Sequence, residues 1–120
     1  MNHNEAFQKL ADDARTRIAE IAPGEVRAAD SPPPVVIDVR EHNEFIQEHI
    51  PGAVHLSRGI LEQRVAEVAP DPAAPIICYC GAGNRGALAA DSLQKMGYTN
   101  VSSIKGGLNA WKAKNLGTES

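Results

Sequence analysis

Short apolar runs alternate with segments of helical periodicity along this sequence, and this alternation limits the possible folds more than any other feature. Strands are predicted at residues 35–39, 53–56, 76–79 and 101–104, and the run at 35–39 is rich in β-branched side chains. Such runs are typical of parallel strands that are covered on both faces. Strands that alternate with helices through short connections predict a single α/β domain, with a mainly parallel central sheet and helices on both faces.

Helices are predicted between and after these strands, at residues 41–49, 60–68, 86–96 and 108–114. Gly97 follows the third of them, as expected for a glycine that ends a helix. In open α/β sheets, ligands bind beyond the carboxyl ends of the strands. The connections that follow the predicted strands are therefore the places to look for chemistry.

The N-terminal segment predicts one more helix, over about residues 4–20, from apolar residues at helical spacing. Its polar face mixes both charge signs, which favours a helix packed on the main domain over one on a membrane surface. A partner-binding helix is the alternative. We therefore expect an N-terminal amphipathic extension at 1–22, a main domain at 23–115 and a frayed tail at 116–120.

The charge balance and the cysteines limit the classes of protein to which this chain can belong. The chain has 120 residues, with 12 Lys and Arg against 15 Asp and Glu, and this mild acidity argues against a nucleic-acid or anionic-membrane binder. No apolar run could span a bilayer, and residues 1–5 are polar, unlike a signal peptide. Cys78 and Cys80 are too close in a strand to join without strain, and unpaired thiols suit a reducing compartment, so we expect a cytoplasmic protein.

The most informative connection is the loop of residues 80–86, which reads Cys-Gly-Ala-Gly-Asn-Arg-Gly between a predicted strand and a predicted helix. A cysteine there faces the helix start, where the dipole and free N–H groups favour a thiolate. The small residues after it let successive N–H groups turn inward around an anion, and an arginine adds a permanent cation. The predicted site therefore comprises the nucleophile Cys80 and the substrate-binding residues Gly81, Ala82, Gly83, Asn84 and Arg85.

The sequence of this loop allows two other interpretations. Residues 81–86 match the G-x-G-x-x-G dinucleotide fingerprint. However, only one strand is predicted after them, and no acidic ribose ligand follows that strand. Taken alone, Cys80 could also be a small buried side chain with only a packing role. The glycines and Arg85 at this spacing favour a functional role for it. Cys78 lies inside the strand and is predicted to pack in the core.

At this point the chain resembles the rhodanese (sulfurtransferase) family, in particular its single-domain members. The resemblance covers about residues 35–113. It rests on five ordered stretches, namely residues 37–41, 44–45, 49–53, 80–85 and 105–108, the last with Trp111. Each stretch is weak alone, whereas the ordered set is highly specific.

The resemblance implies a sulfurtransferase that works without a cofactor. Cys80 would take the outer sulfur of thiosulfate or another sulfane donor, hold it as a persulfide, and pass it to a thiol or to cyanide. A thioredoxin-like protein is one candidate acceptor. The rival hypothesis is a rhodanese-like module that carries sulfur to one partner, or binds it, without turnover.

Loop length separates this chemistry from a neighbouring one. Cys80 and Arg85 form a C-x4-R loop, whereas rhodanese-like phosphatases and arsenate reductases resemble C-x5-R, with one more residue around a larger oxyanion. Gly86 follows Arg85, so the longer ring would lack its arginine. This chain also differs from many family members at position 86, where it has glycine and they carry Ser or Thr.

Several further residues are predicted at the same edge of the sheet. Asp38 and Arg40 look like structural support in the family, bracing loops through hydrogen bonds and an ion pair. Arg58 follows the short strand and either adds positive charge over the loop or is a solvated surface arginine. His49 is expected to form a local hydrogen bond. The other histidines show no ligand spacing with the cysteines, so no metal site is predicted.

Overall fold

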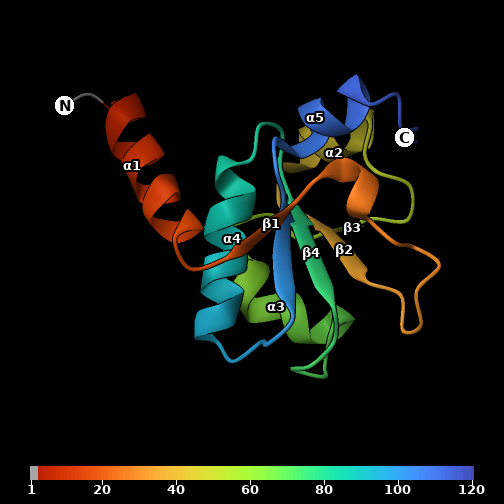
Figure 1. The fold of residues 1–120 in the computed structure, drawn as a ribbon, viewed down its shortest axis with the longest axis horizontal. Helices are drawn as coiled ribbons and strands as arrows, with labels where there is room; N and C mark the ends of the chain where they lie inside the picture. Colours follow the sequence, from red (N-terminus) through yellow and green to blue (C-terminus); the bar gives the residue numbers. More distant parts are fainter. Residues whose placement is uncertain (1–2) are drawn as a thin grey trace.

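The computed structural model describes residues 3–120 as a five-stranded, fully parallel sheet in the order β1-β5-β4-β2-β3. The strands are β1 (Ala19–Ile21), β2 (Val35–Asp38), β3 (Val54–His55), β4 (Ile76–Tyr79) and β5 (Val101–Ile104). The helices are α1 (His3–Arg15), α2 (His42–Gln47), α3 (Leu61–Val68), α4 (Asn84–Lys95) and α5 (Gly107–Ala113), with a short 3-10 helix, η1 (Pro23–Glu25). The predicted α/β fold class is confirmed (Figure 1).

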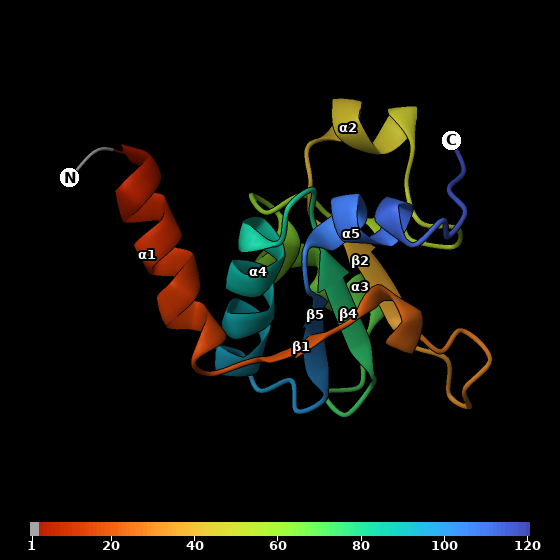
Figure 2. The same ribbon diagram turned by 45° about the horizontal axis from the view of Figure 1, so that its top comes forward.

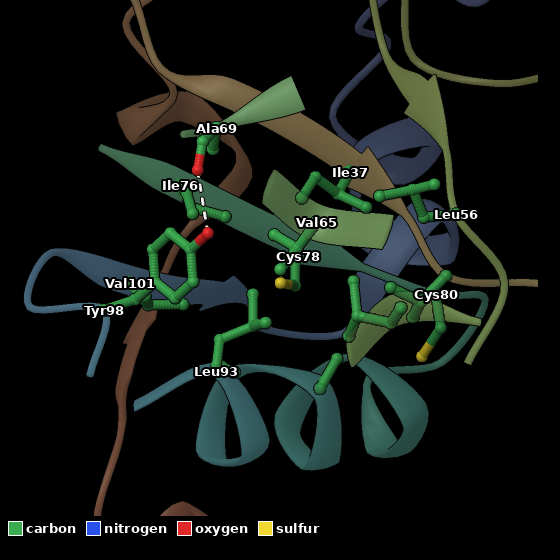
Figure 3. Close-up of a cluster of buried hydrophobic side chains, with 14 residues drawn as sticks. Ile37, Leu56, Val65, Ala69, Ile76, Cys78, Cys80, Leu93, Tyr98 and Val101 are labelled. Atoms are coloured by element: carbon green, nitrogen blue, oxygen red, sulfur yellow. Dashed lines mark hydrogen bonds between the residues drawn. The ribbon is translucent and has the colours of Figure 1, made fainter. Parts of the chain in front are cut away.

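Two cores cover the two faces of the sheet, and β4 contributes to both. Cys78 of β4 packs on one face with Val65 of α3 and Leu93 of α4, as Figure 3 shows. Tyr79 of β4 packs on the other face with Leu108 of α5. All four residues of β4 are buried, because successive side chains point to opposite covered faces.

The N-terminal segment differs from its prediction. The helix ends at Arg15 rather than near residue 20, and residues 19–21 form β1, an edge strand parallel to β5. A three-residue strand carries too little periodicity to be told from the end of a helix, and only its pairing with β5 defines it. Helix α1 lies outside α4, as both views show, and buries Ala11 and Ala14 (Figures 1 and 2). Within residues 3–120, no helix has the length and apolar character to cross a membrane.

The frayed tail expected at residues 116–120 stays a prediction, although residues of this segment form hydrogen bonds with the main domain. Glu119 forms an isolated antiparallel bridge with His49, in which each backbone N–H donates to the other residue's carbonyl oxygen. The indole N–H of Trp111 also donates to the Gly117 carbonyl oxygen at 2.8 Å. These partners are distant in sequence or lie beyond a helix end, so composition alone gave no sign of them.

Candidate functional site

The loop of residues 80–86 follows the central strand of the sheet. Strand β4 lies between β5 and β2, and the loop leaves its carboxyl end to begin α4. Figure 1 shows this connection at the top of the molecule, at the same edge where β2 leads into α2 and β5 into α5. The loop therefore lies where α/β sheets usually place their ligands.

The Cys80 sulfur accepts two backbone hydrogen bonds from its own loop. The N–H groups of Gly83 and Gly86 donate to Sγ at 3.1 and 3.2 Å. Gly83 has a φ of +116°, a left-handed conformation that glycine adopts without strain. Two such donors stabilise negative charge on the sulfur. Cys80 as a whole is 2% exposed, so little of it touches solvent.

A second turn fixes the floor of the loop. The N–H of Leu108 donates to the Cys80 carbonyl oxygen at 2.7 Å, and that of Asn109 donates to Gly81 at 2.9 Å. Gly107 approaches so closely that a Cβ there would lie 2.3 Å from the Cys80 oxygen. The turn between β5 and α5 therefore holds the Cys80 backbone in place, and its second glycine is a steric requirement.

Arg85 lies at the loop, but its guanidinium already has a protein partner. Its Nη1 and Nη2 atoms donate to the two carboxylate oxygens of Glu44 on α2, at 2.9 and 3.1 Å. The Arg85 guanidinium holds the pKa of the Glu44 carboxyl well below its usual range, at about 2. Glu44 belongs to the stretches that carry the family resemblance, yet nothing in the sequence identified it as this partner.

Asp38 and Arg40 form a buried ion pair where β2 leads into α2. The Arg40 Nη2 and Nε atoms donate to the Asp38 carboxylate at 2.8 to 3.1 Å, and both residues are almost fully buried. Arg40 Nη2 also donates to the Glu48 carbonyl oxygen at 2.6 Å. The pair thus ties β2 to the far end of α2, the helix that presents Glu44 to Arg85. This geometry suits structural support, which remains a prediction.

Arg58 lines a different pocket from the one beside the loop. Its Nη1 atom donates to Glu62 at 2.9 Å, and its neighbours in that pocket come from α1, from α4 and from Arg17 just after α1. Among residues 3–120, no side-chain hydrogen bond or ion pair joins Arg58 to the loop of residues 80–86. Arg58 is partly exposed and pairs with Glu62, so its contacts fit a solvated surface arginine better than a residue that adds positive charge over the loop.

Gly86 and Ser103 meet beneath the loop. A Cβ at Gly86 would lie 2.8 Å from the Ser103 Oγ atom. That hydroxyl is buried and has no hydrogen-bond partner within residues 3–120. Ser103 on β5 therefore occupies the space that a side chain at position 86 would need, which explains locally why this chain has glycine there.

A pocket of about 490 Å³ lies beside the loop and was not predicted. Ala82 and Asn84 line it together with residues of α1, and Asn84 exchanges side-chain hydrogen bonds with Gln8. No sequence signal links residues so far apart. Within residues 3–120, no group of three or more His, Cys, Asp or Glu side chains is placed to hold a metal ion.

Comparisons with known proteins agree with this architecture. The family model described as "Rhodanese-like domain" matches residues 23–114. GlpE of Pseudomonas savastanoi pv. phaseolicola, named a thiosulfate sulfurtransferase, is 32% identical over 98 residues, which are 82% of this chain and 91% of GlpE. The crystal structure of a thiosulfate sulfurtransferase from Pseudomonas aeruginosa has a TM-score of 0.83 and 29% identity, covering 95% of this chain and 22% of that one.

A further relative has a different role in its name. YrkF of Bacillus subtilis, named as a candidate sulfur carrier protein, is 35% identical over 79 residues. The match covers 66% of this chain but only 42% of YrkF. The chain therefore spans less than half the length of that relative.

Proposed function

The chain belongs to the rhodanese-like domain family, and from that premise we propose that it is a sulfurtransferase. It moves sulfane sulfur from an anionic donor such as thiosulfate to a thiol or cyanide, with Cys80 as the carrier. The observation that carries this proposal is the pair of N–H groups donating to the Cys80 sulfur. A thiolate that accepts hydrogen bonds from main-chain N–H groups is a nucleophile, and the same N–H groups stabilise negative charge on its sulfur.

In the first half-reaction, the Cys80 thiolate attacks the outer sulfur of thiosulfate. The S–S bond of thiosulfate breaks, and its electron pair leaves on sulfite. A new S–S bond joins that sulfur to Cys80 Sγ, and the persulfide keeps one negative charge. The loop N–H groups that now bind Sγ are placed to share this charge. Because Cys80 is 2% exposed, a small donor suits the loop better than a bulky one.

In the second half-reaction, an acceptor removes the outer sulfur. Cyanide would attack it, the persulfide S–S bond would break, and the electron pair would return to Cys80 as thiolate while thiocyanate leaves. A thiol, on a small molecule or on a thioredoxin-like protein, would react in the same sense. Two separate half-reactions through a covalent intermediate predict ping-pong kinetics.

Arg85 has a double role in this proposal. Its bond to Glu44 fixes the guanidinium at the loop, where Nη2 lies 3.7 Å from the position of a Cβ on Gly81. Glu44 takes one N–H of each Nη atom, so donors remain for an oxygen of the bound donor. Replacing Arg85 with Ala should raise the KM for thiosulfate while persulfide still forms slowly. Arg64→Ala, which removes an exposed arginine paired with Glu67, is the matched control.

The alternative function is a sulfur carrier that does not turn over, and the name of YrkF is the observation that favours it. Mass measurement of the intact protein after thiosulfate treatment, followed by a cyanide turnover assay, separates the two. An enzyme gains one sulfur, loses it to cyanide and cycles many times. A carrier gains the sulfur but shows no multiple turnover. A chain that gains no sulfur on Cys80 refutes both.

The compartment is also part of the proposal. Neither Cys78 nor Cys80 is in a disulfide. Free thiols are typical of a reducing environment. We therefore keep the cytoplasm as the proposed location, to be checked by fractionation of cells that produce the chain.

A further inference from the structure

The N-terminal segment forms part of the pocket beside the Cys80 loop. The pocket measures about 490 Å³, and α1 and β1 supply half of its walls. The lining residues are Gln8, Asp12, Arg15, Glu20, Ala82, Asn84, Lys105 and Gly106. Figures 1 and 2 both show α1 beside α4.

The pocket adjoins the residue whose N–H binds the Cys80 sulfur, although neither Cys80 nor Gly83 lines it. Ala82 and Asn84 flank Gly83, whose N–H donates to Sγ. A Cβ on Gly83 would lie 3.3 Å both from Arg15 Nη2 and from the Gly106 backbone nitrogen. The walls from α1 and from the β5–α5 turn therefore touch the residue that binds the sulfur.

The charges of this pocket are of both signs. Arg15 donates from Nε to Glu20 and from Nη1 to Asp12, each at 3.1 Å. Its Nη2 atom, next to Gly83, has no hydrogen bond to any of residues 3–120. Lys105 forms no ion pair within the same residues. One oxygen each of Asp12 and Glu20 is likewise left over, so the pocket offers free cationic donors and free anionic acceptors together.

Thiosulfate does not account for such a pocket. It is a small dianion that needs donors only, and carboxylates beside it would repel it. The volume lies in the range of sites for larger organic ligands. A ligand that carries both an ammonium and a carboxylate group would bind both the anionic and the cationic groups of the pocket.

We propose that this pocket binds the acceptor, and that the acceptor is a zwitterionic thiol of the amino-acid class. The inference rests on the proposed function and names the substrate of its second half-reaction. The carboxylate would lie at Lys105 and Arg15, and the ammonium group at Asp12 and Glu20. The thiol would point along the loop toward Cys80.

In the transfer step, the acceptor thiol gives its proton to the negatively charged outer sulfur of the Cys80 persulfide, and the resulting thiolate attacks that sulfur. The bond between that sulfur and Sγ breaks, and its electron pair stays on Sγ as thiolate. The proton remains on the transferred sulfur, and the acceptor leaves as its own persulfide.

A panel of four thiols tests this assignment. Cysteine carries both charges, 3-mercaptopropionate only the carboxylate, cysteamine only the ammonium group, and 2-mercaptoethanol neither. The KM for each is expressed per thiolate, because the four thiols ionise differently. We expect cysteine to have the lowest KM, by roughly three- to tenfold over 2-mercaptoethanol, as for charge pairs at half-exposed positions.

Two variants with matched controls locate the contacts. Lys105→Gln should raise the KM for cysteine relative to that for cysteamine, and Asp12→Asn should raise it relative to that for 3-mercaptopropionate. Lys114→Gln and Asp30→Asn, which change exposed residues outside the pocket, should keep the wild-type order. A chain that transfers sulfur to cyanide but treats all four thiols alike overturns the acceptor pocket alone. A chain that transfers no sulfur to cyanide refutes the proposed function, and the acceptor assignment with it.

Discussion

Cys78 and Cys80 are two residues apart, belong to the same core cluster and are almost equally covered, with 0% and 2% exposure. Their chemical surroundings nevertheless differ in kind. Aliphatic side chains surround Cys78, and burial raises the pKa of its thiol to about 12. Cys80 lies where the strand ends, and two backbone N–H groups donate to its sulfur. Figure 3 shows Cys78 between the sheet and the helices, and Cys80 at the end of the cluster.

Burial by itself does not decide what a cysteine can do. Removing a thiol from water disfavours its charged form unless hydrogen-bond donors replace the water. Inside a strand the backbone N–H groups are already paired with neighbouring strands. None of them is therefore available to donate a hydrogen bond to the Cys78 sulfur. At a helix start the N–H groups are unpaired and can turn to a side chain, as they do around Cys80.

The largest effect is expected from exchanging each cysteine for alanine. Cys80→Ala should lower kcat/KM for thiosulfate by more than roughly 10³-fold, because it removes the nucleophile. Cys78→Ala should leave it within about threefold while destabilising the fold by about 1–2 kcal/mol through the lost packing. Steady-state kinetics and thermal unfolding of both variants check this. Loss of activity in Cys78→Ala with an intact fold would contradict the division of roles.

The next largest effect is expected at alkaline pH, where the ionisation of Cys78 in the unfolded chain should lower the stability of the fold. The pKa of the Cys78 thiol is near 9 when solvated and about 12 in the fold, so only the unfolded chain ionises between these values. The unfolding free energy should therefore fall as pH rises from about 9 to about 12, by on the order of a few kcal/mol from this group. Cys78→Ala should make that fall shallower. The measurement is chemical unfolding across this pH range, and equal slopes in the two proteins would rule out the explanation.

Adding a side chain beneath the loop should disturb the surroundings of Cys80 and leave those of Cys78 intact. Gly86→Ser puts a Cβ 2.8 Å from Ser103 Oγ, and we expect a loss of about 1–3 kcal/mol from overpacking, with slower persulfide formation. Ser103→Ala removes a buried hydroxyl without a partner and should cost little. The double variant should therefore recover part of the loss. A double variant as unstable as Gly86→Ser would show that the clash lies elsewhere.

The smallest effect concerns the ion pair next to Cys80. The pKa of the Glu44 carboxyl is lowered to about 2 by Arg85, so its contribution to stability is present above about pH 4.5 and is lost as pH falls toward 2. Glu44→Gln should cost about 1 kcal/mol near neutral pH, a modest figure because a third of each side chain is exposed, and almost nothing at pH 2. Glu67→Gln, which breaks a more exposed pair, should cost less. A pH-independent difference between wild type and Glu44→Gln would contradict this account.

The local features of the site could be predicted, and the partners of its charged residues could not. The strand, the glycine-rich loop and the following helix are encoded within residues 76–96, where periodicity and small side chains act over a few positions. The Arg85–Glu44 pair joins residues 41 positions apart. The prediction of Arg85 as a permanent cation at the loop did not include the carboxylate that α2 brings to it. Arg58 likewise lies in a pocket with residues of α1 and α4, which are distant from it in sequence.

The sequence by itself determined the α/β fold, the place of the Cys80 loop at the carboxyl end of a central strand, and the packing role of Cys78. These follow from apolar periodicity and from backbone geometry that a few neighbouring residues decide. Only the tertiary structure decided that residues 19–21 form an edge strand, that Glu119 pairs with His49, and that α1 forms a wall of the pocket beside the loop. Each of these depends on which distant segments meet, and that is set by how the two cores close around the sheet, not by any short pattern in the chain.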